Sequence, residues 1–168
     1  RLQDLTGQQC LLQRYTDVDA AIVDELSITA VFISGNGADA DLYDDRDLDG
    51  LAQIVRSGRT PVFGFCGGLQ FIGRTLGARL ERVGELPPGE PDPNPEFAPG
   101  WRTELGYEPV ELIGEHPLLD GLGVQPVFRH AHSWELKDMP DGFVNLARTP
   151  ITEHQYLAHS SLPLAGTQ

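Results

Sequence analysis

The chain has 168 residues, of which 40% are hydrophobic and 22% charged, values typical of a globular protein that can bury a core. Its formal net charge of −13 argues against nucleic acid or an anionic membrane as the main partner, because both are bound through basic surfaces. It contains only 2 cysteines and no apolar stretch long enough to cross a bilayer, which excludes a disulfide framework and a membrane span and indicates a cytoplasmic setting.

The sequence looks cut at both ends. It begins with Arg1 rather than methionine, and it stops within the apolar run 162–168. Natural termini usually lie at the surface and are more polar than this run. We therefore expect residues 1–168 to form a single domain that belongs to a longer product.

The first predicted elements are short. A strand is expected at residues 10–15, and a helix at 20–26 with Asp17 or Asp19 as its N-cap. The continuous apolar run 30–33 predicts a strand that is buried on both faces. Strands and helices thus begin to alternate near the start of the chain.

Two helices and another strand are predicted next. The loop 34–37, Ser-Gly-Asn-Gly, leads to a helix from Leu48 to Val55 that Gly58 should close. A strand at 61–63 precedes a second helix, whose apolar residues recur at spacings of three and four: Leu69, Ile72, Leu76, Leu80 and Val83. Strands alternating with helices of these lengths indicate an α/β fold with an open, mostly parallel sheet and flanking helices.

The second half of the chain has a different pattern. Residues 84–100 hold six of the 13 prolines and four acidic residues without any lysine or arginine, which predicts an extended loop or a flap. Short strands are expected beyond this loop, some of them antiparallel, at 107–113, 127–130, 144–147 and 164–167.

Cys66 lies at the sharpest predicted turn. The segment 64–68 reads Gly-x-Cys-x-Gly, the thiol counterpart of the strand-turn-helix elbow that presents a nucleophilic serine in hydrolases. Flanking glycines allow the tight turn, and the N-terminus of the following helix favours the thiolate. We therefore expect Cys66 to react with alkylating agents before Cys10 does. A buried cysteine in a glycine-rich turn is the alternative interpretation.

A thiol that attacks a carbonyl carbon needs donors for the oxyanion that develops. The backbone N–H of Gly67, directly after Cys66, is one candidate. The loop 34–37 is the other, because it leaves the carboxyl end of a neighbouring strand, where open α/β sheets bind ligands.

Four segments, in the same order along the chain, resemble the class I (triad-type) glutamine amidotransferases. Residues 66–70 match that family's Cys-x-Gly-x-Gln signature, and 33–37 are similar to its Ser-Gly-Gly-Pro-Gly oxyanion strand. Residues 132–135 resemble its His-Ser-x-Glu segment, and 166–168 the start of its Gly-x-Gln-Phe-His-Pro-Glu motif. Residues 106–108 and 115–118 resemble the GMP-synthase-like branch in particular.

The resemblance implies a flavodoxin-like fold and a role for each matching residue. Cys66 would attack the side-chain amide of glutamine, release ammonia and form a thioester that water hydrolyses, with the N–H groups of Asn36 and Gly67 as the oxyanion hole. The remaining matching positions would bind the substrate: Gly35, Gln70, His132, Ser133 and Trp134. The resemblance implies no cofactor and no metal, and its partner would be a synthetase domain or subunit that receives the ammonia.

Three departures from the family pattern matter. The catalytic histidine and its orienting glutamate would directly follow Gln168 and are not among these residues, so this chain is expected to be poorly active by itself. Asn36 replaces a glycine of the oxyanion loop, although asparagine tolerates left-handed backbone geometry. Gly67 replaces a larger residue, which should loosen the pocket wall.

The five histidines offer no evident base. A lone histidine is more often structural, and only His132 is expected near the site, as a substrate-binding residue. His130 and His132 share one face of a predicted strand, but without a third ligand nearby we do not expect them to bind a metal. Two other functions stay open: a γ-glutamyl peptide hydrolase on the same scaffold, and a non-catalytic module.

Overall fold

The computed structural model describes residues 2–37 and 44–168. Its helices are α1 (Leu2–Thr6), α2 (Ala20–Glu25), α3 (Asp49–Ser57) and α4 (Gly67–Thr75), with 3-10 turns η1 (Tyr15–Asp17), η3 (Asp45–Leu48) and η4 (Pro117–Leu119). Its strands are β1 (Val31–Ile33), β2 (Val62–Phe65), β3 (Leu80–Arg82), β4 (Glu104–Pro109), β5 (Glu111–Leu112), β6 (Val127–His132), β7 (Trp134–Leu136), β8 (Phe143–Arg148), β9 (Tyr156–His159) and β10 (Leu164–Thr167).

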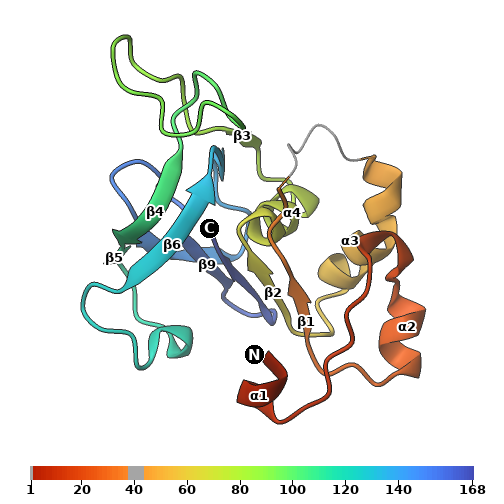
Figure 1. Ribbon diagram of the computed structural model, residues 1–168. Coiled ribbons are helices and arrows are strands. Elements are labelled where there is room, and N and C mark those ends of the chain that lie inside the picture. Colours follow the sequence, from red (N-terminus) through yellow and green to blue (C-terminus); the bar gives the residue numbers. More distant parts are fainter. Residues whose placement is uncertain (1, 38–43) are drawn as a thin grey trace.

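The main sheet has six strands in the order β1-β2-β10-β9-β8-β5. The strands β1, β2 and β10 run parallel, whereas the pairings β10-β9, β9-β8 and β8-β5 are antiparallel. Two further pairs, β3-β7 and β4-β6, form small antiparallel sheets. Figure 1 shows α2, α3 and α4 on the side of β1 and β2, with β4 and β6 on the opposite side of the molecule. The predicted α/β fold, with a parallel portion and additional antiparallel strands, is confirmed.

The predicted ends of two helices are also confirmed. The carboxylate of Asp19 accepts a hydrogen bond of 2.9 Å from the backbone N–H of Ile22, so it caps α2 as expected. Gly58 ends α3 with φ at +58°, and a Cβ there would lie 2.9 Å from a methyl carbon of Leu162. Glycine is therefore favoured at position 58 by its backbone conformation, since the Leu162 side chain could move away from a Cβ.

The core lies on both faces of the main sheet. Side chains alternate along each strand, so Leu157 and Leu164 face the helices while Ala158 and Ala165 face the other side. The helix-side cluster includes the fully buried residues Val55, Leu69 and Ile72 from α3 and α4. The second cluster is formed mainly by β8, β9 and β10: Val110, Leu146, Ala147, Tyr156, Ala158 and Ala165.

Several predicted elements differ from the structure. Residues 10–15 contain no strand, because this exposed segment has no neighbouring strand to pair with. Helix α4 ends at Thr75, and Leu80 instead begins β3; Gly77, with φ at +97°, separates the two. Strand β1 lies at the edge of the sheet with Phe32 43% exposed, so it is not buried on both faces.

The proline-rich segment 84–100 forms the predicted loop. It contains no helix or strand of its own, and its ends are joined by a bridge between Glu85 and Trp101. Inside the loop the Asp92 carboxylate accepts hydrogen bonds from the backbone N–H groups of Asn94 and Gly100. Figure 1 shows this yellow-green segment extending away from the sheets. Whether it acts as a flap stays a prediction.

Within residues 2–37 and 44–168, no helix combines the length and the apolar character that crossing a bilayer requires.

Candidate active site

Cys66 occupies a strained elbow between β2 and α4. Its φ is +49° and its ψ −108°, and Ser27 is the only other non-glycine residue with positive φ in the described part of the chain. Such a conformation costs about 1–3 kcal/mol and is retained mainly at functional sites. The predicted elbow is therefore present, and the backbone strain falls on the cysteine itself.

The glycines around Cys66 are required because backbones approach closely there. A Cβ at Gly64 would lie 2.4 Å from the carbonyl carbon of Gly68, and a Cβ at Gly68 would lie 2.3 Å from the carbonyl oxygen of Ile33. Helix α4 thus packs directly against β1 and β2. This contact holds the elbow at the carboxyl end of the parallel strands.

The protonation of Cys66 differs from the sequence-based expectation. The side chain is half-buried, and burial raises the pKa of its thiol, while a hydrogen bond from the Gly67 N–H opposes that rise. Burial dominates, so the pKa lies above the ordinary value for a cysteine and the thiol is neutral at pH 7. This direction is opposite to the one expected from the helix N-terminus, and the reactivity of Cys66 stays a prediction.

The loop after β1 lies beside Cys66. A Cβ at Gly35 would be 3.4 Å from the Cβ of Cys66 and 4.0 Å from its sulfur. The adjoining pocket has a volume of about 310 Å³, within the range of small-molecule sites. Four of the predicted site residues line it: Gly35, Asn36, Gly67 and Gln70.

The larger side chain of Asn36 makes up for the missing side chain volume at Gly67. A Cβ at Gly67 would lie 2.1 Å from Oδ1 of Asn36 and 3.2 Å from its backbone nitrogen. The Asn36 side chain therefore fills the space that a larger residue at position 67 would occupy, and the expected loosening of the pocket wall does not occur. Asn36 also has no positive φ, so its tolerance of left-handed geometry is not used.

The carbonyl oxygen of Trp134 accepts three side-chain hydrogen bonds. Gln70 donates from Nε2 at 3.0 Å, Gln168 from Nε2 at 3.1 Å, and His132 lies with Nδ1 at 3.0 Å. This oxygen joins α4, the end of β10 and the turn between β6 and β7. Gln70 is thereby held in the lining of the pocket, and substrate binding by Gln70 stays a prediction.

The side chains of residues 132–134 contact other parts of the protein and do not line the pocket. Nη1 of Arg82 donates to Oγ of Ser133 at 2.6 Å, and the Arg82 guanidinium lies 4.4 Å from the ring centre of Trp134. Nε2 of His132 lies 2.9 Å from Oε2 of Glu104. Substrate binding through the backbone of this segment stays a prediction, but none of the three side chains lines the 310 Å³ pocket.

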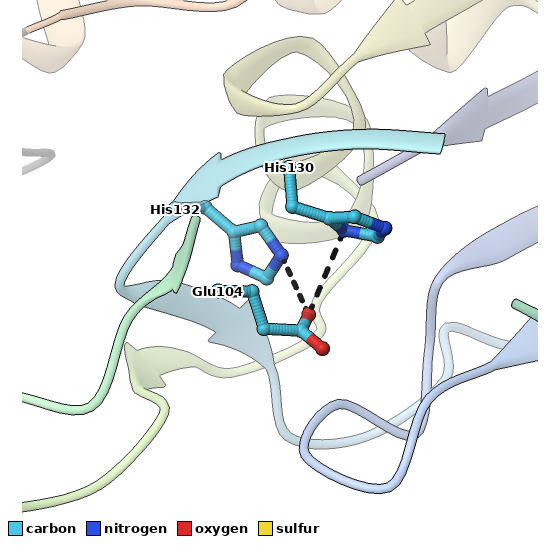
Figure 2. A group of neighbouring side chains, drawn as sticks. All are labelled: Glu104, His130 and His132. Carbon is cyan, nitrogen blue, oxygen red and sulfur yellow. Dashed lines mark ion pairs between the residues drawn. The ribbon is translucent and has the colours of Figure 1, made fainter. Parts of the chain in front are cut away.

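Glu104 is a buried group that the sequence analysis missed. In the β4-β6 ladder it lies opposite His132, and its Oε2 is 2.9 Å from Nε2 of His132 and 3.7 Å from Nδ1 of His130. Figure 2 shows both imidazole rings directed at this one oxygen. The premise that His130 and His132 lack a third potential ligand is therefore wrong: strand pairing supplies one from a distant part of the chain.

Hydrogen bonds hold Glu104 in its ionised form. Burial by itself would raise the pKa of its carboxyl group, but the close contact with His132, a hydrogen bond from Thr149 and the nearby His130 together outweigh burial and lower the pKa below its usual value. Gln155 donates a further hydrogen bond to Oε2. The carboxylate is thus negatively charged at neutral pH although it is buried.

No histidine of the described chain is hydrogen-bonded to Cys66. His132 contacts Glu104, and Nδ1 of His154 is 2.9 Å from the carbonyl oxygen of Leu136. The remaining three are His130, beside Glu104, and His116 and His159, which accept backbone hydrogen bonds in turns. The end of β10 lies closest to the elbow, since the Cys66 N–H donates to the carbonyl oxygen of Thr167 at 2.7 Å.

Comparison with known proteins agrees with this geometry. The glutamine-hydrolyzing GMP synthase of Thermomicrobium roseum is 29% identical over 153 residues, which are 91% of this chain but 25% of that protein. One subunit of the glutamine-hydrolyzing GMP synthase of Methanopyrus kandleri is 29% identical over 112 residues, 67% of this chain and 51% of that protein. This chain thus spans about half or less of these relatives' length.

A solved structure shares the fold. The crystal structure of a putative GMP synthase subunit from Thermoplasma acidophilum superposes with a TM-score of 0.71 at 21% identity, covering 91% of this chain and 67% of that one. The family model described as glutamine amidotransferase class-I matches residues 5–168. With its cysteine elbow and adjoining loop, this chain belongs to the class I glutamine amidotransferase family.

Proposed function

We propose that this chain is the glutaminase part of a glutamine amidotransferase, which hydrolyses the side-chain amide of glutamine and passes ammonia to a synthetase. The observation that carries the proposal is the strained Cys66 elbow, which lies beside Gly35, while the next residue, Gly67, lines a pocket together with Gly35 and Asn36. Family membership supports the same chemistry.

In this proposal the sulfur of Cys66 attacks the amide carbon of glutamine. The carbonyl oxygen becomes an oxyanion that the N–H groups of Gly67 and Asn36 stabilise. When the C–N bond breaks, the nitrogen takes up a proton and leaves as ammonia, and a thioester remains on the sulfur. Water then attacks the thioester carbon, which releases glutamate and restores the thiol.

The first step needs a base, because the Cys66 thiol is neutral at pH 7 in this chain. A base held near the end of β10 could reach the sulfur, since Thr167 and Cys66 share a backbone hydrogen bond of 2.7 Å. We propose that the base comes from residues beyond Gln168. Poor activity of residues 1–168 alone stays a prediction.

The names of the relatives support the proposed partner. Several are named as one subunit of a glutamine-hydrolyzing GMP synthase, and the longer ones are called GMP synthases without any subunit designation. We propose that this glutaminase works with a synthetase domain or subunit that uses its ammonia. A GMP-forming synthetase is the best-supported candidate.

Glutamate release from glutamine by the product of the whole gene tests the proposal. We expect turnover in the parent protein and in the control variant Cys10→Ser, whose cysteine is exposed. Cys66→Ser should lower turnover by about 10³-fold or more, because it removes the nucleophile. Turnover that survives Cys66→Ser would contradict the proposal, and a preference for γ-glutamyl peptides over glutamine would favour the hydrolase alternative.

A further inference from the structure

Three potential metal ligands converge away from Cys66. Glu104 on β4 lies opposite His132 on β6, and Gly106, which has no side chain, lies opposite His130. The Glu104 carboxylate therefore faces both imidazoles, and one ligand atom from each residue lies within 4.8 Å of the other two (Figure 2). All three side chains are almost completely buried.

The hydrogen bonding of His132 directs a lone pair at the carboxylate. Nδ1 of His132 is 3.0 Å from the carbonyl oxygen of Trp134, which can only accept, so Nδ1 carries a hydrogen. In the neutral ring Nε2 then has a lone pair, 2.9 Å from Oε2 of Glu104. Two acceptors at this distance require a positive particle between them, either a proton or a metal ion.

His130 distinguishes these two possibilities. It is 1% exposed, and its ring nitrogens have no hydrogen-bond partner of normal geometry within the described residues, although the ring also interacts with the Glu108 backbone. A proton shared by His132 and Glu104 would leave this buried imidazole without a well-formed hydrogen bond, which is costly. A metal ion would engage His130 together with the other two groups.

We propose that Glu104, His130 and His132 bind one divalent first-row transition-metal ion of the zinc type. Two ligand atoms on a tetrahedral zinc lie about 3.3 Å apart, and the distances here from Oε2 to the two nitrogens, 2.9 and 3.7 Å, lie on either side of that value. Two imidazoles and one carboxylate suit zinc, whereas magnesium and calcium prefer oxygen ligands.

The surrounding groups match the outer shell of a metal site. The Trp134 carbonyl accepts from the far nitrogen of His132, and Thr149 and Gln155 donate to the Glu104 carboxylate. The ion would join β4 to β6 and fix the Trp134 carbonyl, which also holds Gln70 at the glutamine pocket. Its role would be structural, and its binding does not depend on the proposed glutaminase activity.

The direct test uses the chain of residues 1–168 after treatment with a chelator. We expect titration calorimetry to show one Zn²⁺ bound per chain, and Zn²⁺ to raise the melting temperature. Glu104→Gln and His130→Asn should each weaken binding by at least about 10-fold. Two matched controls should bind normally: His116→Asn, which changes a histidine outside the cluster, and Cys66→Ser, which removes a competing thiol.

X-ray absorption of the zinc-loaded parent chain keeps the test independent of how the variants fold. Two imidazole ligands with oxygen and no sulfur would support the proposal. A spectrum with sulfur or without imidazole would overturn it, as would the absence of stoichiometric binding or equal binding by the parent chain and both cluster variants.

Discussion

The Cys66 elbow and the Glu104 cluster differ in the backbone strain and in the burial of their polar groups. At the elbow a single half-buried thiol is held in a strained backbone conformation beside Gly35 of the loop after β1. In the cluster, Glu104, His130 and His132 lie on ordinary strands, closed off from solvent. The comparison indicates that backbone strain accompanies the proposed nucleophile, whereas complete burial accompanies the proposed structural metal ligands.

The largest expected effect lies in the cluster. Glu104→Ala removes the carboxylate that Thr149, Gln155 and His132 contact, and we expect the metal-free chain to lose about 3–5 kcal/mol in free energy of unfolding. Urea denaturation in the presence of a chelator measures it. Glu111→Ala is the matched control, because Glu111 forms an exposed ion pair with Arg148 and should matter little. Equal stability of the two variants would contradict the expectation that the buried carboxylate contributes more to the free energy of unfolding than the exposed one.

A somewhat smaller loss is expected at the elbow. In Gly68→Ala the new Cβ would lie 2.3 Å from the carbonyl oxygen of Ile33, a backbone atom that cannot move away alone. We expect about 3 kcal/mol of destabilisation in urea denaturation. Gly123→Ala is the control, since a Cβ there meets nothing within 4 Å. If Gly68→Ala were as stable as that control, the close packing of α4 on β1 would be disproved.

The smallest expected effect concerns chemical reactivity. Because burial raises the pKa of Cys66, its thiolate fraction at neutral pH is low, and we expect iodoacetamide to alkylate it more slowly than the exposed Cys10. The rate at Cys66 should rise as the pH rises beyond the ordinary range for thiols. Mass spectrometry of both peptides over time measures this. Faster labelling of Cys66 at pH 7 would show that the helix N-terminus outweighs burial.

Much of the parallel half of the fold could be predicted because its signals are local. The Asp19 cap, the Gly58 helix end and the Cys66 turn each depend on residues within a few positions of one another. The strands β7 and β9 were not predicted, since they are short and are defined by their pairing with β3, β8 and β10. The segment 10–15 shows the converse, an apolar run without a partner strand.

At the site too, features that depend on neighbouring residues could be predicted, whereas features that depend on strand pairing could not. Gly35, Asn36, Gly67 and Gln70 were identified from two short motifs, and the parallel pairing of β1 with β2 brings those motifs to one pocket. Glu104 could not be identified, because only the β4-β6 register places it opposite His132. Substrate binding by the backbone of residues 132–134 stays a prediction, and the side chains of His132 and Ser133 contact Glu104 and Arg82.

The sequence by itself determined the elbow and its family, because glycine spacing and helix periodicity act over neighbouring residues; that Cys66 is the nucleophile stays a prediction. Only the tertiary structure decided how acidic the thiol is, how Asn36 fills the space beside Gly67, and which groups meet in the Glu104 cluster. These properties depend on desolvation and on strand register, and both arise only when distant segments pack together.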